Sequence, residues 1–150
     1  MANTTYKELA DAVFNKIKDH SFCEMTEEIA YNIVISYLRP AIINYQSCKQ
    51  DLSKRDDELQ VFYIKLSDET FIILVNYMVI EWLTSNYILT SSNLKPRLSP
   101  SDFHSLGLKD MLQKAIDLRS ELMDENNQLA INKSYNNSNI FDMVKKRKKV

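Results

Sequence analysis

The residues best suited to bind a metal ion are two histidines and two cysteines, spread widely over the chain. His20 and Cys23 have the H-x-x-C spacing of a ligand pair, and Cys48 and His104 are the remaining cysteine and histidine. Zinc sites usually combine two close pairs of ligands, and this chain has one. We therefore expect the cysteines to be ordinary thiols, and we expect no metal site.

Acid–base or nucleophilic catalysis has equally little support in the sequence. The chain has a single glycine, Gly107, which excludes the dinucleotide-binding, Walker A and kinase loops, since each needs several glycines. The clusters Glu27–Glu28 and Asp56–Glu58 bring carboxylates together. Such clusters at a helix start or in a charged loop are usually caps or solvated faces, whereas catalysis needs carboxylates in a cleft. We expect neither enzymatic activity nor a cofactor.

The C-terminal segment has the composition of a docking peptide. A polar linker (134–139) precedes a group of apolar residues and then a basic run that ends the chain. The residues that we expect to contact a partner are Ile140, Phe141, Met143, Val144, Lys145, Lys146, Arg147, Lys148 and Lys149. Extended peptides of this kind bind by filling a groove or by adding a strand to a sheet. The alternative is a polar, solubilising end without a specific role.

Charge is unevenly distributed between this segment and the rest of the chain. The net charge is −1, and because five positive charges lie in residues 145–149, residues 1–144 carry −6. A body of that sign is a poor nucleic-acid binder, since neutralising phosphates supplies most of the affinity. Nothing at the N-terminus is typical of a signal peptide. The apolar stretch 71–89 contains Asn76 and Glu81, so we expect a cytosolic protein with no membrane span.

Apolar periodicity predicts a mainly α protein, a bundle of about four helices. Glycine and proline are scarce, with one and three residues, which also favours helices. Helices are predicted over 4–19, 26–48, 67–87 and 108–131, and a short extended segment over 61–66. Thr4 or Thr5 can cap the first helix, and Glu8, three residues after Thr5, completes a capping box. Ser67 caps the third helix. Pro40 should kink or divide the second helix near Arg39.

The predicted organisation is a helical domain, 1–131, followed by an extended C-terminal arm, 132–150. The extended segment 61–66 has no obvious partner strand, so it is either half of a hairpin or an edge open to another chain. The helices at 26–48 and 67–87 are apolar nearly all round, which is typical of a central helix or one shared with a neighbouring subunit. They hold more apolar surface than a four-helix monomer comfortably buries.

The segment VFYIKLSDETFIILVNYMVIEWL (61–83) resembles a segment of small head–tail connector proteins of tailed bacteriophages. Its features are an aromatic strand, the helix start L-S-D-E and a long apolar helix. The later L-S-P-S-D-F (98–103) and the long helix after it fit the same pattern, so the resemblance covers roughly residues 25–135.

The resemblance implies a structural neck, or adaptor, protein of the virion, assembled in the host cytoplasm. Such proteins form a homo-oligomeric ring of about a dozen copies beneath the portal, which lines the channel through which DNA leaves. The implied partners are the portal and other neck or tail proteins, with packaged DNA close by. The alternative from another class is a small phage or host regulatory protein that binds its partner through the C-terminal segment. A third possibility, nucleic-acid binding, depends on the basic run alone.

Overall fold

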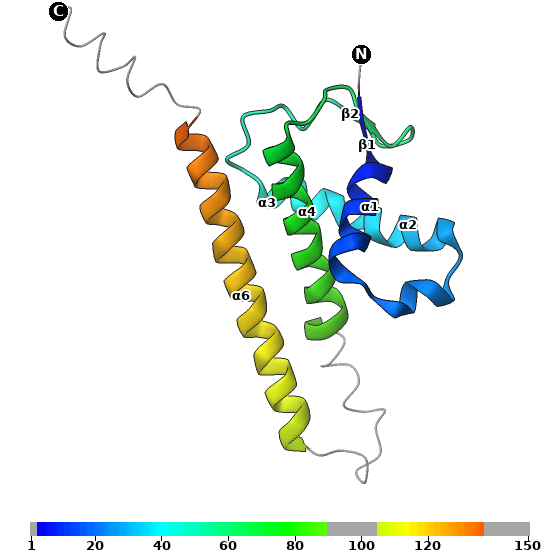
Figure 1. Cartoon of the computed structure of the whole chain (residues 1–150), viewed down its shortest axis with the longest axis vertical. Coiled ribbons are helices and arrows are strands. Elements are labelled where there is room, and N and C mark those ends of the chain that lie inside the picture. Colours follow the sequence, from blue (N-terminus) through cyan, green and yellow to red (C-terminus); the bar gives the residue numbers. More distant parts are fainter. Residues whose placement is uncertain (1–2, 90–104, 137–150) are drawn as a thin grey trace, which may run out of the picture.

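The computed structural model describes residues 3–89 and 105–136, and it is a mainly α bundle with a small sheet at one end (Figure 1). The predicted fold class is therefore confirmed. The predicted docking residues 140–149 and His104 lie outside the described residues. In chain order the α-helices are α1 (Tyr6–Ile17), α2 (Glu27–Ser36), α3 (Leu38–Asn44), α4 (Asp68–Leu83) and α6 (Ser105–Asn136). A 3-10 helix, η1 (His20–Glu24), precedes α2, and a π-helical turn, η2 (Thr84–Leu89), continues α4.

Helix α4 is the centre of the bundle and packs against α1, α3 and α6 (Figure 1). Because it has neighbours on several sides, apolar residues are buried all around it, as its sequence predicted. The buried residues of α4 are Thr70, Ile73, Leu74, Val75, Tyr77, Met78, Ile80, Trp82 and Leu83. Ser67 caps the helix as predicted, since its hydroxyl accepts a hydrogen bond from the Thr70 amide.

The same segment is apolar enough to raise the question of a membrane. Asp68–Ile88 could cross a bilayer by length and composition, with a mean hydropathy of 1.3 over its most apolar window. Core helices of soluble proteins pass the same test, and polar residues of α4 bind neighbouring helices here. Asn44 of α3 donates to Glu81 at 3.0 Å, for example. We interpret the segment as a core helix.

The break between α2 and α3 is explained by Pro40. Pro40 has no N–H to donate to the carbonyl of Ser36, four residues earlier, and its ring crowds that carbonyl. The helix therefore ends at Ser36 and restarts at Leu38, with Pro40 in the first turn of α3, where a missing N–H does no harm. The prediction that Pro40 divides the helix is confirmed, but the break is at Tyr37, two residues before the predicted position near Arg39.

The sheet corrects two expectations. Strand β3 (Val61–Phe62) is shorter than the predicted segment and lies between β1 (Thr4–Thr5) and β2 (Arg55–Asp56), antiparallel to both. It is therefore half of a hairpin with β2, and it is not an edge open to another chain. The polar, highly charged sequence of residues 49–60 predicts a loop, but these residues contain β2. Gln60 turns the chain with φ of 54°, a left-handed position that glycine would normally take.

Helix α6 extends further than predicted at both ends. It begins at Ser105 and continues to Asn136, so residues 132–136, predicted as the start of the arm, are helical. Contacts with the body explain the extra turn. Lys133 Nζ lies 2.7 Å from Ser67 Oγ, and Lys49 Nζ donates to the Ser134 carbonyl at 3.0 Å. The part of the predicted arm that is left, 137–150, lies outside the described residues.

Candidate assembly surfaces

Side-chain amides hold α6 against α4. Asn126, 1% exposed, accepts a hydrogen bond from Asn76 Nδ2 at 3.0 Å and donates to the Ile73 carbonyl at 3.1 Å. On the next residue, Asn127 accepts from the Tyr77 hydroxyl at 2.7 Å. Buried amides tolerate little displacement, because each shift leaves a polar group unpaired. The pairing therefore fixes which face of α6 lies on α4.

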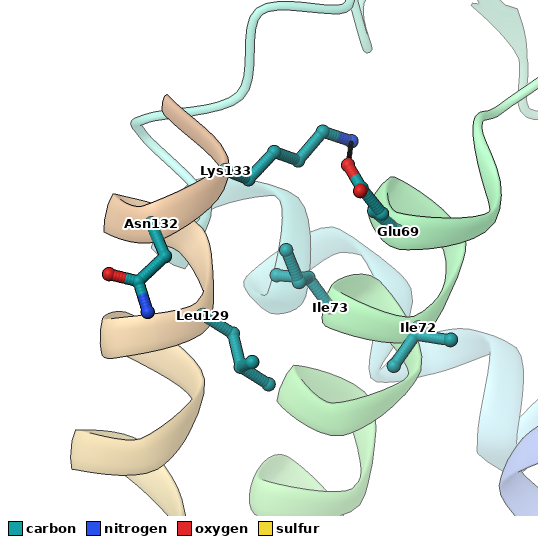
Figure 2. Close-up of a pocket in the computed structure, with 6 residues that line it drawn as sticks. All are labelled: Glu69, Ile72, Ile73, Leu129, Asn132 and Lys133. Atoms are coloured by element: carbon teal, nitrogen blue, oxygen red, sulfur yellow. Dashed lines mark ion pairs between the residues drawn. The ribbon is translucent and has the colours of Figure 1, made fainter. Parts of the chain in front are cut away.

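A cavity of about 230 Å³ opens between α4 and α6 near the end of α6; we call it the end cavity. Figure 2 shows Lys133 reaching from α6 to Glu69 on α4, with Leu129 and Ile73 below this ion pair. The ammonium-to-carboxylate distance is 3.6 Å. The residues that line the cavity are Glu69, Ile72, Ile73, Leu129, Asn132 and Lys133. Ile72 is 49% exposed and Leu129 is 48% exposed, so the cavity presents apolar surface to solvent.

The contact between Lys133 and Ser67 places an amine beside a hydroxyl, the pair found in some nucleophilic sites. Both groups have structural partners here. Ser67 Oγ accepts from the Thr70 amide at 3.3 Å as the helix cap, and Lys133 also binds Glu69 and the Thr70 hydroxyl. We interpret Lys133 as a tie between α6 and the start of α4.

An open hollow of about 620 Å³ lies between α1, η1 and α2; we call it the η1 hollow. Its floor is aromatic, because Phe14 packs edge-on against Phe22 and against Tyr31, with ring centroids 5.2 and 5.3 Å apart. Met25 lines the hollow and is exposed. Charged residues of both signs, Lys18, Asp19 and Glu27, complete the lining. An apolar floor with a charged rim is typical of a protein-binding surface.

Helix α6 carries exposed apolar side chains on two different sides. Ile116 is 41% exposed and Leu118 is 46% exposed. Because they are two residues apart, they point about 200° from each other around the helix axis, so each offers an apolar contact on its own side of the helix. Helix α6 and the helices that line the η1 hollow, α1 and α2, lie on opposite sides of α4 (Figure 1). Besides the end cavity, the described body thus presents apolar side chains on two opposite sides.

The residues that the sequence nominated for chemistry have ordinary positions where they are described. Cys23 is exposed and Cys48 is half-buried, and within 3–89 and 105–136 no group of three His, Cys, Asp or Glu side chains is placed to hold a metal ion. The carboxylate clusters have structural positions, as interpreted from the sequence. Glu27 and Glu28 are exposed in the first turn of α2. Asp56 accepts from the amides of Leu59 and Glu58 in the turn after β2, and these bonds, with one from the Tyr63 hydroxyl, hold the pKa of Asp56 below its usual value.

Two structural surfaces were not found by sequence reasoning. The end cavity and the η1 hollow each combine side chains that are distant in the sequence, such as Ile72 with Leu129 and Phe14 with Tyr31. Their one sequence signal is the excess of apolar residues on the second and third predicted helices. Comparison with known proteins found no family model, no curated protein and no solved structure that matches the chain.

Proposed function

We propose that this protein is a structural subunit of a bacteriophage neck. Copies assemble head to tail into a ring of about a dozen, which joins the portal to the tail around the DNA exit channel. In this role the protein needs no catalytic group and no cofactor. Its C-terminal segment (140–149) binds the portal or another neck or tail protein.

The observation that carries the assembly part is the pair of non-equivalent apolar surfaces. A ring requires that each copy offer two different surfaces, one to each neighbour, whereas a two-fold dimer uses one surface twice. Leu118 on α6 and the η1 hollow meet this requirement, because one is a projecting side chain and the other is a hollow. The helices that carry them, α6 on one side and α1 and α2 on the other, lie on opposite sides of α4 (Figure 1). In the proposed contact, Leu118 of one copy packs over Phe14, Phe22 and Met25 of the next.

The resemblance of residues 61–83 to connector proteins supports the virion part. In the structure this segment comprises β3 and α4, which form the centre of the sheet and of the bundle. The charge distribution is also suited to a channel, since the acidic body (−6 over residues 1–144) repels DNA that passes it. The five positive charges at the C-terminus are suited to an acidic site on a partner.

Two charge substitutions test the head-to-tail contact. Leu118→Glu places a charge on the α6 side, and Met25→Glu places one in the η1 hollow. Each leaves the other surface intact, and both residues are exposed, so the fold is retained. A buried charge in place of an apolar contact costs about 2 kcal/mol or more, roughly a thirtyfold loss in affinity. Sedimentation velocity over a concentration series is the measurement.

We expect the wild-type full chain to form species larger than a dimer and each variant alone to remain monomeric. An equimolar mixture of the two should form dimers and nothing larger, because one contact can form between unlike variants and none can follow it. Ile43→Glu, on an exposed residue of α3, is the control and should assemble as the wild type does. A wild-type protein that stays monomeric, or a mixture without dimers, would refute the head-to-tail contact.

The neck itself is tested by affinity purification of the tagged full-length protein from the cells that make it, followed by mass spectrometry. We expect portal, capsid or tail proteins to be recovered. A variant with serine at positions 140, 141, 143 and 144 should retain self-assembly and lose the portal. Recovery of a host enzyme or polymerase without virion proteins would contradict the neck and favour the regulatory module.

A further inference from the structure

The end cavity leaves apolar side chains of both α4 and α6 exposed to solvent. Ile72 and Leu129, from opposite sides of the opening, are each about half exposed, and Ile73 forms the floor (Figure 2). The cavity is therefore a partly formed apolar site between two helices, which needs a third group of side chains to shield it from water.

The position of the cavity along the chain identifies an occupant. Helix α6 ends at Asn136, and Leu129 lies seven residues earlier, about 10 Å back along the helix axis. The next apolar residue after the helix is Ile140, and four extended residues span about 13 Å. The chain that continues from α6 can therefore return to the cavity directly, and residues 140–144 supply four apolar side chains.

Charge around the cavity fits the same occupant. Asp68 and Glu69 are exposed in the first turn of α4, beside the opening. Lys133 is paired with Glu69, so Asp68 provides a second carboxylate in the same turn. The basic residues 145–149 follow directly after the apolar group. When residues 140–144 occupy the cavity, the basic run comes close to these two carboxylates.

We infer that in the free protein the segment Ile140–Val144 docks into the end cavity of its own chain. Docking brings apolar side chains of this segment onto the cavity and covers Ile72 and Leu129 at the same time. A partner that binds this segment must then displace it from the cavity, and displacement exposes Ile72. The inference concerns the purified protein alone and does not depend on the proposed function.

Thiol labelling of the full-length chain tests this docking. In a background of Cys23→Ser and Cys48→Ala, a single cysteine is placed at Ile72 or, as the control, at Leu118. Leu118 lies 18 residues before the end of α6, about 27 Å away, which is beyond the reach of Ile140. The labelling rate of each cysteine is compared between the natural C-terminal segment and one with serine at 140, 141, 143 and 144. Labelling at low protein concentration avoids self-assembly.

We expect the four serines to raise the labelling rate of the cysteine at position 72 by about tenfold, since the rate follows the undocked fraction. The cysteine at position 118 should label at the same rate in both chains. Equal rates at position 72 would overturn the inference. Protection that increases with protein concentration would also overturn it, because the segment would then come from a second copy. Neither result bears on the head-to-tail contact, which the sedimentation experiment tests separately.

Discussion

Replacing Asn126 with alanine tests whether the buried amide holds α6 on α4. The substitution removes the acceptor for Asn76 Nδ2 and the donor to the Ile73 carbonyl, in a position that is 1% exposed. The neighbouring residue offers a matched control. Asn127→Ala makes the same chemical change one residue away, where the side chain is exposed and loses one hydrogen bond, from the Tyr77 hydroxyl.

The expected magnitudes follow from these contacts. Each lost hydrogen bond costs about 1 kcal/mol, and Asn126→Ala loses two at a buried position, where a group left unpaired costs about 1–3 kcal/mol more. Alanine is the better helix former by up to about 0.7 kcal/mol, which offsets part of the loss equally in both variants. We expect Asn126→Ala to lower the free energy of unfolding by about 2–4 kcal/mol and Asn127→Ala by about 1 kcal/mol or less.

Urea unfolding of the full chain measures both values. Far-UV circular dichroism follows the helices, and the single tryptophan, the buried Trp82 of α4, follows the core. If α6 separates before the rest of the bundle, the two signals will have different midpoints, and the first transition is the one to compare. Equal losses in the two variants, or a loss below about 0.5 kcal/mol for Asn126→Ala, would refute the argument that the buried amide fixes α6.

Two further predictions concern the stability of the body. Thr5→Ala removes the capping box of α1. In this box Thr5 Oγ1 accepts from the Glu8 amide at 3.3 Å, and the Glu8 carboxylate accepts from the Thr5 amide at 2.7 Å. Urea unfolding should show that the free energy of unfolding falls by about 1 kcal/mol. Burial raises the pKa of Tyr45 to about 12, so the folded chain holds the phenol proton more tightly than the unfolded chain does. The contribution of Tyr45 to the free energy of unfolding is complete below about pH 10 and is lost as the pH rises toward 12. Between these pH values the free energy of unfolding of Tyr45→Phe should therefore fall by about 2 kcal/mol less than that of the wild type.

Features that depend on near neighbours in the sequence were predictable. The capping box at Thr5, the cap at Ser67 and the break caused by Pro40 each involve groups within four residues of one another. The sheet was not predictable in the same way. Its strands are two residues long and pair Thr4 with Phe62, so neither strand contains a period that sequence reasoning can detect. The end of α6 was also missed, because contacts from Lys49 and Ser67 extend it.

The assembly surfaces show a similar division. The sequence of α4 is apolar on all sides, which predicted that neighbours would bury the helix on several sides. Most of its residues are buried. Ile72 is the exposed apolar residue of α4, because it lies at the opening of the end cavity, where α6 does not cover it. Periodicity identifies an apolar face, but it does not say whether a neighbour covers that face. The predicted docking segment, 140–149, lies outside the described residues, so its role stays a prediction.

The polar contact between α4 and α6 connects the fold to the proposed assembly. A shift of one residue along a helix turns its side chains by about 100°, so the register of α6 decides where Ile116 and Leu118 point. Apolar packing alone would hold several registers with similar energy, since leucine and isoleucine fill a groove without directional bonds. Asn126 with Asn76, and Asn127 with Tyr77, pair in one register. A ring needs every copy to present its α6 surface in the same direction, and these directional bonds supply that uniformity.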